Sequence, residues 1–200
     1  MTIMVGGFLA NGTPERLIDA LVEKNVKNLT LICNDTGFPD RGVGKMVVNK
    51  QFKKIIASHV GTNPETANQM NSGQTEVVLT PQGTLAEKIR CGGHGLGGFY
   101  TPTGVGTEAA EGKEIRVING KEYVFETPLR AEIALLRASI ADKKGNLIFK
   151  KTMKNFNPIM ATAADLVIVE ADKIVEIGEI DPEHVMCSGI FVDYIVGGDK

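Results

Sequence analysis

Cysteine and histidine are scarce in this sequence, and neither occurs in a spacing that binds metal or builds a disulfide framework. Cys33, Cys91 and Cys187 are odd in number and far apart, with no C-x-x-C pair, and the three histidines form no H-x-x-x-H pair. Zinc sites and disulfide-rich scaffolds depend on such spacings. We therefore expect no metal ion and a reducing compartment, which indicates a cytoplasmic protein.

Long apolar runs and a surplus of one charge are also absent. The longest apolar runs fall far short of a membrane span, and the N-terminus lacks the basic and apolar regions of a signal peptide. Lys and Arg number 22 against 24 Asp and Glu, so the chain has no cationic surplus for a nucleic-acid backbone. From these absences we expect that the protein binds neither a membrane nor a nucleic acid.

The length and composition fit one globular unit. With 200 residues, of which 42% are hydrophobic, the chain can build a sizeable core without disulfides or metals. No linker, repeat or low-complexity segment interrupts it. We expect a single domain that spans residues 1–200.

Strand-like and helix-like segments alternate along the chain. Apolar runs typical of strands lie at residues 2–5, 29–33, 55–56, 77–79, 147–149, 166–170 and 190–196. Residues 133–140 fit either a strand or a helix, and we favour a strand. Alternation of this kind predicts an α/β fold, with an open and mostly parallel sheet flanked by helices.

Helix starts can be read between these strands. Thr13 is predicted to cap a helix with Pro14 at its first position, and Asn63 precedes a proline in the same way. Thr84 and Glu87 form an S/T-x-x-E capping box that would open a third helix.

Residues 92–106 interrupt the alternation with seven glycines. Beyond them, the apolar residues at 115–118 and 123–125 flank an Asn-Gly pair at 119–120, which predicts an inserted β-hairpin with a type I′ turn. A further helix is expected near residues 158–164.

The first candidate site is the glycine turn at residues 6–12, between the first strand and the following helix. Unpaired N–H groups and the positive end of the helix dipole would suit a phosphate or carboxylate there. The turn lacks the G-x-G-x-x-G pattern and the Lys-Ser/Thr pair of a P-loop. A tight turn without a ligand is therefore an equal alternative.

The second candidate is Gln82, at the carboxyl end of the strand at 77–79. Ligands of open α/β sheets bind at that edge, and an amide N–H can stabilise negative charge that grows on a carbonyl oxygen. The alternative is a turn residue without a catalytic role. Asn34 and Asp35 follow another strand at the same edge, where they either line the same cleft or cap a turn.

The third candidate is the glycine-dense loop at residues 91–106, which could lie closely against an extended ligand. Its alternative is a surface excursion around the hairpin. Cys91 is disfavoured as a nucleophile because no His or Asp stands at a recognisable offset, and His94 is near in sequence only.

Several motifs, in order along the chain, resemble those of the family I coenzyme A transferases. Gly-Gly-Phe-x-x-x-Gly-x-Pro occupies residues 6–14, Asn-Asp-Thr residues 34–36, and Thr-Pro-Gln-Gly-Thr-Leu residues 80–85. Further matches lie at residues 58–61, 63–64, 89–93, 101–104 and 154–158. The resemblance covers essentially the whole chain, and the α subunits that act on acetate, butyrate and acetoacetate are nearest in pattern.

The resemblance implies an enzyme that moves coenzyme A from a short-chain acyl-CoA, such as acetyl-, butyryl- or acetoacetyl-CoA, to a free carboxylate by ping-pong chemistry on a glutamate. That glutamate lies in a Ser-Glu-Asn-Gly motif, which is absent here because the two Asn-Gly pairs follow Ala10 and Ile118. The chain is therefore expected to be an α subunit that is inactive without a β subunit carrying the glutamate, in an α2β2 assembly. Coenzyme A is implied as a substrate, with no tightly bound cofactor.

The resemblance also assigns residues to roles. The segment implied in coenzyme A binding is Gly6, Gly7, Phe8, Leu9, Ala10, Asn11 and Gly12. Gln82 matches a glutamine that faces the catalytic glutamate and the reacting carbonyl. Asn34, Gly97 and Gly98 are expected in the substrate cleft.

An alternative function comes from proteins of the same architecture. Sugar-phosphate isomerases and ligand-sensing regulatory domains also bind ligands at the carboxyl edge of a parallel sheet, so a stand-alone small-molecule binder would fit the fold equally well.

The resemblance further implies a helix ahead of the first strand, whereas this chain opens directly in that strand.

Overall fold

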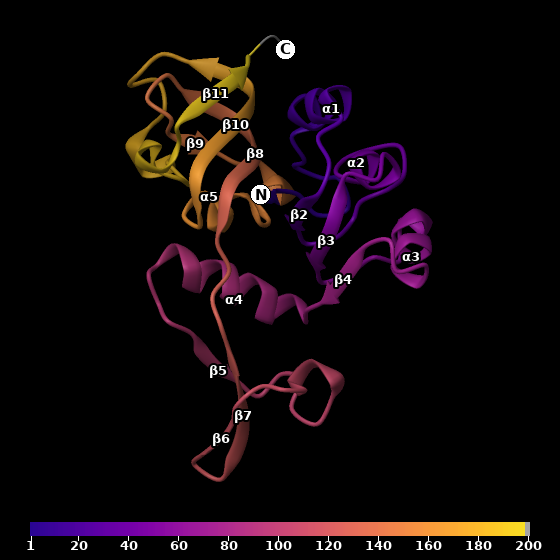
Figure 1. The fold of residues 1–200 in the computed structure, drawn as a ribbon. Coiled ribbons are helices and arrows are strands. Elements are labelled where there is room, and N and C mark those ends of the chain that lie inside the picture. Colours follow the sequence, from indigo (N-terminus) through magenta and orange to yellow (C-terminus); the bar gives the residue numbers. More distant parts are fainter. Residues whose placement is uncertain (199–200) are drawn as a thin grey trace.

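One large sheet forms the framework of the computed structural model, which describes residues 1–198 (Figure 1). Its strand order is β11-β10-β8-β1-β2-β3-β4, and β9 adds to β8. All pairings along this order are parallel, and only the β8–β9 pairing is antiparallel. The strands are β1 (Thr2–Val5), β2 (Leu29–Ile32), β3 (Phe52–Ala57), β4 (Glu76–Leu79), β8 (Ala131–Asp142), β9 (Leu147–Ile148), β10 (Ala164–Val175) and β11 (Tyr194–Gly197). The predicted α/β class is confirmed.

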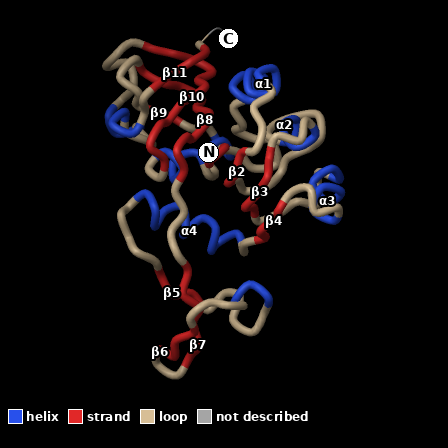
Figure 2. Tube along the Cα trace, viewed as in Figure 1, coloured by secondary structure: helices blue, strands red, loops and turns tan. Residues whose placement is uncertain are grey.

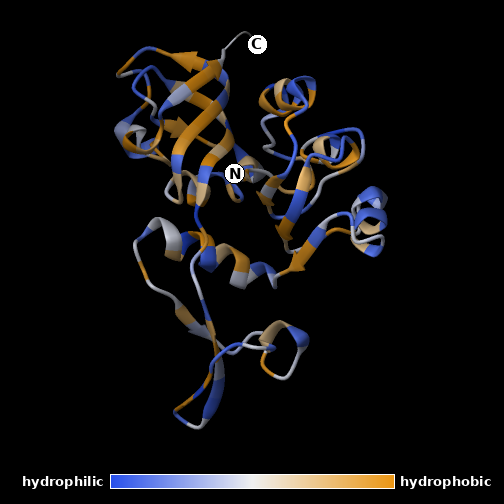
Figure 3. Ribbon diagram, in the orientation of Figure 1, coloured by the Kyte–Doolittle hydropathy of each residue, from blue (hydrophilic) through white to orange (hydrophobic). Residues whose placement is uncertain are grey.

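Helices cover both faces of this sheet. They are α1 (Glu15–Lys24), α2 (Gly44–Val48), α3 (Pro64–Asn71), α4 (Gln82–Gly93) and α5 (Asn157–Ala161), with short 3-10 helices η1 (Glu108–Ala110), η2 (Lys151–Lys154), η3 (Pro182–His184) and η4 (Gly189–Phe191). Ile3 of β1 packs in one cluster with Ile18 of α1, whereas its neighbour Met4 packs in another with Leu85 of α4. Successive strand residues face opposite sides, so apolar residues are needed on both faces of the sheet, and Figure 3 shows long hydrophobic stretches in β8 and β10. None of the helices within residues 1–198 is both long and apolar enough to cross a membrane.

The predicted cap at Thr13 is wrong. α1 begins two residues after it, and no side chain of the adjoining segment caps the helix. Instead, the buried carboxylate of Glu170 in β10 accepts hydrogen bonds from the backbone N–H groups of Arg16 (2.8 Å) and Leu17 (3.4 Å). A distant acid thus stabilises the positive end of α1. These two N–H groups of α1 already donate to Glu170. They are therefore not available to an anion that binds at the turn at residues 6–12.

The predicted capping box at Thr84 and Glu87 is also wrong, because α4 begins two residues before Thr84, at Gln82. The Thr84 hydroxyl is buried without a hydrogen-bond partner in the part of the chain that the structure describes. The predicted cap at Asn63 is confirmed, since its side chain accepts a hydrogen bond from the N–H of Glu65 at 3.2 Å.

Residues 99–126 form a second sheet, which we call the arm. Its strands β5 (Phe99–Thr101), β6 (Ile115–Ile118) and β7 (Lys121–Glu126) are ordered β5-β7-β6. The predicted hairpin is confirmed, and Asn119 and Gly120 have the positive φ values, 51° and 76°, that its turn requires. Figures 1 and 2 show the arm standing away from the large sheet, beyond α4.

The glycine-dense segment is more regular than predicted. α4 extends to Gly93, and β5 pairs with β7, so only residues 94–98 and 102–106 of this segment lie outside a helix or strand. Local composition concealed this strand because its pairing partner lies more than twenty residues further along the chain.

The C-terminal segments follow the predictions with shifted boundaries. β8 confirms the strand at 133–140, and β9 and β10 confirm two others. α5 ends at Ala161, and Ala164 already belongs to β10. The predicted last strand divides into η4 and the shorter β11.

A buried ion cluster anchors the arm to α4. Glu126 of β7 has only 2% of its side chain exposed, and its carboxylate contacts Nζ of Lys88 in α4 (2.8 Å) and of Lys113 (2.6 Å). Burial raises the pKa of Glu126, but hydrogen bonds and charges from Lys113 and Lys88 outweigh burial and hold that pKa below its ordinary value. The ionised form of Glu126 therefore stabilises the folded chain.

We predict that this contribution depends on pH. Because the folded pKa of Glu126 is lowered, the stabilisation is present above the unfolded pKa of about 4.3 and is lost as the pH falls through the folded value. The difference in free energy of unfolding between wild type and Glu126→Gln should shrink as the pH falls below about 4.3. Urea unfolding at a series of pH values measures it. Glu122→Gln, at an exposed position of β7, is the control, and equal pH profiles for the two variants would contradict the prediction.

Candidate active site

A cavity of about 390 Å³ opens at the carboxyl ends of β1, β2 and β3, beside the first turn of α4. Ligands of open α/β sheets bind at this edge. The cavity is lined by Phe8 and Leu9 after β1, Asn34 and Asp35 after β2, Ser58, His59 and Thr62 after β3, and Gln82 of α4.

Gln82 and Asn34, predicted separately, lie in direct contact. Nε2 of Gln82 donates a hydrogen bond to Oδ1 of Asn34 at 2.8 Å, and the Ser58 hydroxyl donates to the same oxygen at 3.1 Å. Nδ2 of Asn34 donates to Asp35 at 2.8 Å, which fixes the end of the amide that faces Gln82. Gln82 is exposed, and its contact with Asn34 uses one of the two N–H bonds of a primary amide. The second can serve a ligand.

The carboxylate of Asp35 joins this pair to the glycine turn. Its Oδ2 accepts a hydrogen bond from the N–H of Leu9 (2.9 Å) as well as from Asn34, and its Oδ1 accepts one from the N–H of Gly37 (2.8 Å). Asp35 is buried, and these donors replace the hydrogen bonds to water that its carboxylate loses on burial.

The turn at residues 8–11 is strained and exposed. Two backbone hydrogen bonds between Phe8 and Asn11, of 3.0 and 2.9 Å, close it. Its central residues Leu9 and Ala10 have φ values of 46° and 66°, a region that costs a residue with a Cβ roughly 1–2 kcal/mol. The bond from Leu9 to Asp35 offsets part of this strain, and the turn holds the exposed Phe8 and Leu9 side chains at the rim of the cavity.

Two asparagines hold the turn from its other side. The buried side chain of Asn157 donates to the carbonyl of Gly12 at 3.0 Å, and Asn155 donates to the carbonyl of Asn11 at 3.0 Å. A Cβ on Gly6 would overlap Oδ1 of Asn157, so this position requires glycine. Sequence reasoning missed these two roles, although the family motif at 154–158 contains both asparagines.

Gly97 and Gly98 are not brought to this cavity. They follow the C-terminal end of α4, whereas Gln82 opens its N-terminal end, and a helix of 12 residues is about 18 Å long. Gly98 instead packs closely against Phe125 of the arm. Within residues 1–198, no three His, Cys, Asp or Glu side chains gather in a group that could hold a metal ion.

Comparison with known sequences assigns this arrangement to a family. The profile described as Coenzyme A transferase matches residues 1–198. The chain belongs to the coenzyme A transferase family. It is 55% identical over 196 residues to the acetate CoA-transferase subunit alpha of Escherichia coli K12, an alignment that covers 98% of this chain and 89% of that one. It is 53% identical to the acetoacetyl-CoA:acetate/butyrate CoA transferase alpha subunit of Clostridium acetobutylicum, covering 98% and 90%.

Solved structures show the same coenzyme A transferase fold. The acyl-CoA transferase YdiF of E. coli O157:H7, in a thioester complex with CoA, superposes with a TM-score of 0.88 at 22% identity. The alignment covers 98% of this chain and 44% of that chain, so this chain spans less than half of YdiF. The family resemblance read from the sequence is confirmed. These relatives do not favour the alternative of a stand-alone sugar-phosphate binder or regulatory domain.

We predict that the Asp35→Asn substitution loosens the glycine turn. The amide would place a donor where N–H groups now converge, so the free energy of unfolding should fall by about 1–3 kcal/mol. The backbone amide of Leu9 should exchange faster with solvent, which hydrogen exchange measures residue by residue. Asp40→Asn, at an exposed position, is the matched control and should change stability by less than about 0.5 kcal/mol. Unaltered protection of the Leu9 amide would show that Asp35 does not hold the turn.

Proposed function

We propose that this chain is the α subunit of a heteromeric enzyme that moves coenzyme A between a short-chain acyl-CoA and a free carboxylate. Acetyl-, butyryl- and acetoacetyl-CoA are the proposed donors, in line with the names of the two relatives. The observation that carries the proposal is the chemistry of the cavity. Among the described residues that line it, Asp35 is the only acid, and both of its oxygens accept hydrogen bonds within the chain. The cavity therefore offers hydrogen-bond donors but no unbonded carboxylate that could act as the nucleophile.

The nucleophile is proposed to be a glutamate of the β subunit. Its carboxylate attacks the thioester carbonyl, and the C–S bond breaks to give a mixed anhydride and CoA thiolate. The thiolate then attacks the glutamyl carbonyl, releasing the first carboxylic acid as its carboxylate and leaving a glutamyl-CoA thioester. The second carboxylate repeats these steps in reverse. The free N–H of Gln82 would stabilise the negative charge on the carbonyl oxygen in each attack.

The turn at residues 6–12 is proposed to bind coenzyme A. It separates the cavity beside Gln82 from a second one of about 500 Å³, lined by Phe8, Leu9, Asn11, Thr152 and Asn155. An acyl-CoA is far longer than either cavity. Its thioester would therefore lie beside Gln82, and the rest of the molecule would pass over the Phe8 and Leu9 side chains toward the second cavity. We keep Asn34 as a cleft residue. We do not extend the proposal to Gly97 and Gly98, because they lie beyond the far end of α4.

The assembly and location are part of the same proposal. We propose that residues 1–200 act as one domain in a cytoplasmic α2β2 enzyme that needs no tightly bound cofactor, since the chemistry requires only carboxylates and thiols. The free thiols of Cys33, Cys91 and Cys187 fit a reducing compartment.

Reconstitution tests the division of labour. Mixing this chain with a β subunit that carries Ser-Glu-Asn-Gly should produce CoA exchange between labelled acetate and acetoacetyl-CoA, whereas either chain alone should be inactive. Exchange by this chain in isolation would disprove that its partner supplies the nucleophile. Size exclusion of the mixture measures the expected α2β2 mass.

The Gln82→Ala substitution tests the donor. Removing one oxyanion donor should lower kcat of the reconstituted enzyme by roughly 10²-fold. Gln74→Ala, at an exposed turn, is the control and should leave kcat unchanged. An unchanged kcat for Gln82→Ala would reduce Gln82 to a structural turn residue.

A further inference from the structure

The arm exposes apolar surface that no part of residues 1–198 covers. Every residue from 111 to 122 is exposed, and Val117 of β6 leaves 64% of its surface open, with Ile115 and Ile118 also exposed beside it. The outer part of the arm is a two-stranded hairpin, which is marginally stable in water without a packing partner. A second surface is therefore expected to pack against it.

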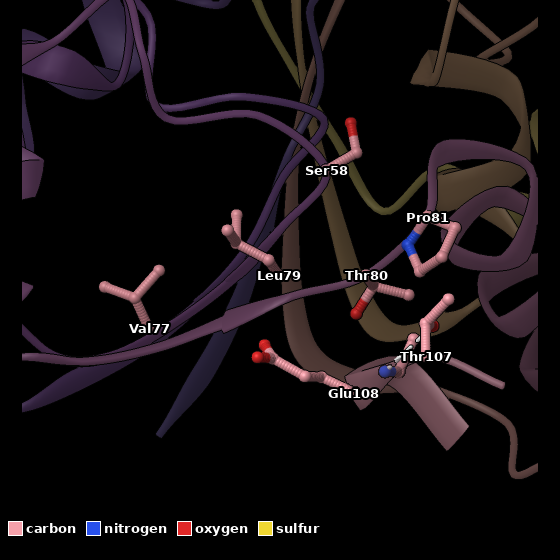
Figure 4. Close-up of a pocket in the computed structure, with 8 residues that line it drawn as sticks. Ser58, Val77, Leu79, Thr80, Pro81, Thr107 and Glu108 are labelled. Atoms are coloured by element: carbon pink, nitrogen blue, oxygen red, sulfur yellow. Dashed lines mark hydrogen bonds between the residues drawn. The ribbon is translucent and has the colours of Figure 1, made fainter. Parts of the chain in front are cut away.

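A groove of about 590 Å³ lies between the arm and the edge of the large sheet. Val77, Leu79, Thr80 and Pro81 line one side, and residues 107–109, around η1, line the other. In Figure 4, Val77 and Leu79 lie along β4, and the Glu108 side chain extends from η1 toward that strand. Leu79 is 54% exposed, so the groove has a substantial apolar surface.

The strand that borders this groove has a free edge. β4 ends the order of the large sheet, and the N–H of Thr80 donates to the carbonyl of Ala57 in β3 at 2.9 Å. Because successive residues of a strand direct their backbone groups to opposite edges, Val77 and Leu79 direct theirs away from β3. An exposed apolar edge of this kind aggregates unless something pairs with it or covers it.

We propose that the subunit that carries the nucleophile docks on the free edge of β4, on the groove, and on the exposed part of the arm at residues 111–122. This inference rests on the proposed function. The nucleophile must come within about 3 Å of a carbonyl held beside Gln82. Ser58 lines both the groove and the Gln82 cavity, and Pro81 directly precedes Gln82. A partner on this surface therefore borders the reacting atoms.

A second exposed apolar patch lies too far away for this purpose. It contains Ile190 of η4, which is 82% exposed, and Tyr194 of β11. β11 lies four strands from β2, roughly 19 Å at 4.8 Å per strand, whereas β4 lies two strands from β2, roughly 10 Å. Of these two patches, the one at β4 is the nearer to Asn34 and Gln82.

A protein, rather than the substrate, is the occupant that fits this surface. A single acyl-CoA could fill the groove, but it could not also cover the exposed length of the arm at residues 111–122. In YdiF, the part that matches this chain is 44% of the whole, so more than half of that polypeptide lies outside the match.

Matched lysine substitutions test the surface in the complex with the partner that carries Ser-Glu-Asn-Gly. Leu79→Lys and Val117→Lys place a charge at the proposed interface, whereas Ile190→Lys makes the same change on the distant patch. We expect Leu79→Lys and Val117→Lys each to raise the Kd for the partner by at least about 30-fold, which is 2 kcal/mol. Ile190→Lys should stay within about threefold of wild type. Calorimetry measures Kd, and thermal melting of each free chain confirms that it is folded.

Each other outcome is decisive. Loss of binding in Ile190→Lys, with Leu79→Lys and Val117→Lys unaffected, would move the interface to β11 and overturn the inference. Normal binding by Leu79→Lys with a raised KM for acyl-CoA would assign the groove to the substrate and overturn it too. Val117→Lys alone decides the matter if Leu79→Lys does not fold. A wild-type chain that binds no such partner would instead refute the proposed function, before any variant is compared.

Discussion

The hydrogen bonds to the Asp35 carboxylate are the interaction on which the site depends. One oxygen holds both the strained backbone of Leu9 and the side chain of Asn34, and the other holds the N–H of Gly37. Asn34 in turn orients Gln82. Two loops that follow neighbouring parallel strands are thereby fixed relative to each other and to the start of α4. The positions of the turn and of the Gln82 amide follow from a single buried charge.

The same device recurs elsewhere in the fold. Glu170 of β10 accepts hydrogen bonds from the first turn of α1, and Glu126 of the arm accepts them from lysines in α4 and in the preceding loop. Each carboxylate is buried, and each joins segments that are distant in sequence. Buried charges are costly unless they are fully bonded, so each of these acids ties its neighbours to one geometry.

The electrostatics of the cavity suit a visiting carboxylate. The charge of Asp35 is compensated by N–H donors, and the cavity is also lined by the uncharged polar side chains of Asn34, Ser58, Thr62 and Gln82 and by the imidazole of His59. A free acid there would repel a second carboxylate and raise its pKa, which would favour its protonated form, and that form is not a nucleophile. In the proposed enzyme, these donors would let an ionised glutamate and an ionised substrate approach the same carbonyl. Because the proposed nucleophile belongs to the partner subunit, catalysis would depend on assembly.

The sequence by itself determined most of the strands, the α/β class and the family. Apolar runs of strand length, the Asn63 cap and the Asn-Gly turn at 119–120 are local signals, set by burial period and backbone φ. The cap and the turn were found as predicted, and so were the strands, with shifted boundaries and with the run at 190–196 divided between η4 and β11. It also placed Asn34 and Gln82 at the same edge of the sheet, because carboxyl ends of parallel strands share that edge.

Only the tertiary structure decided what caps α1, how β5 pairs, and where Gly97 and Gly98 lie. The cap comes from Glu170, which is 154 residues from Arg16, and β5 exists because β7 pairs with it. Gly97 looked close to Gln82 in sequence, but the rigid length of α4 separates them. Side-chain hydrogen bonds and strand pairing join residues by distance in space, and no local pattern in the sequence encodes that distance.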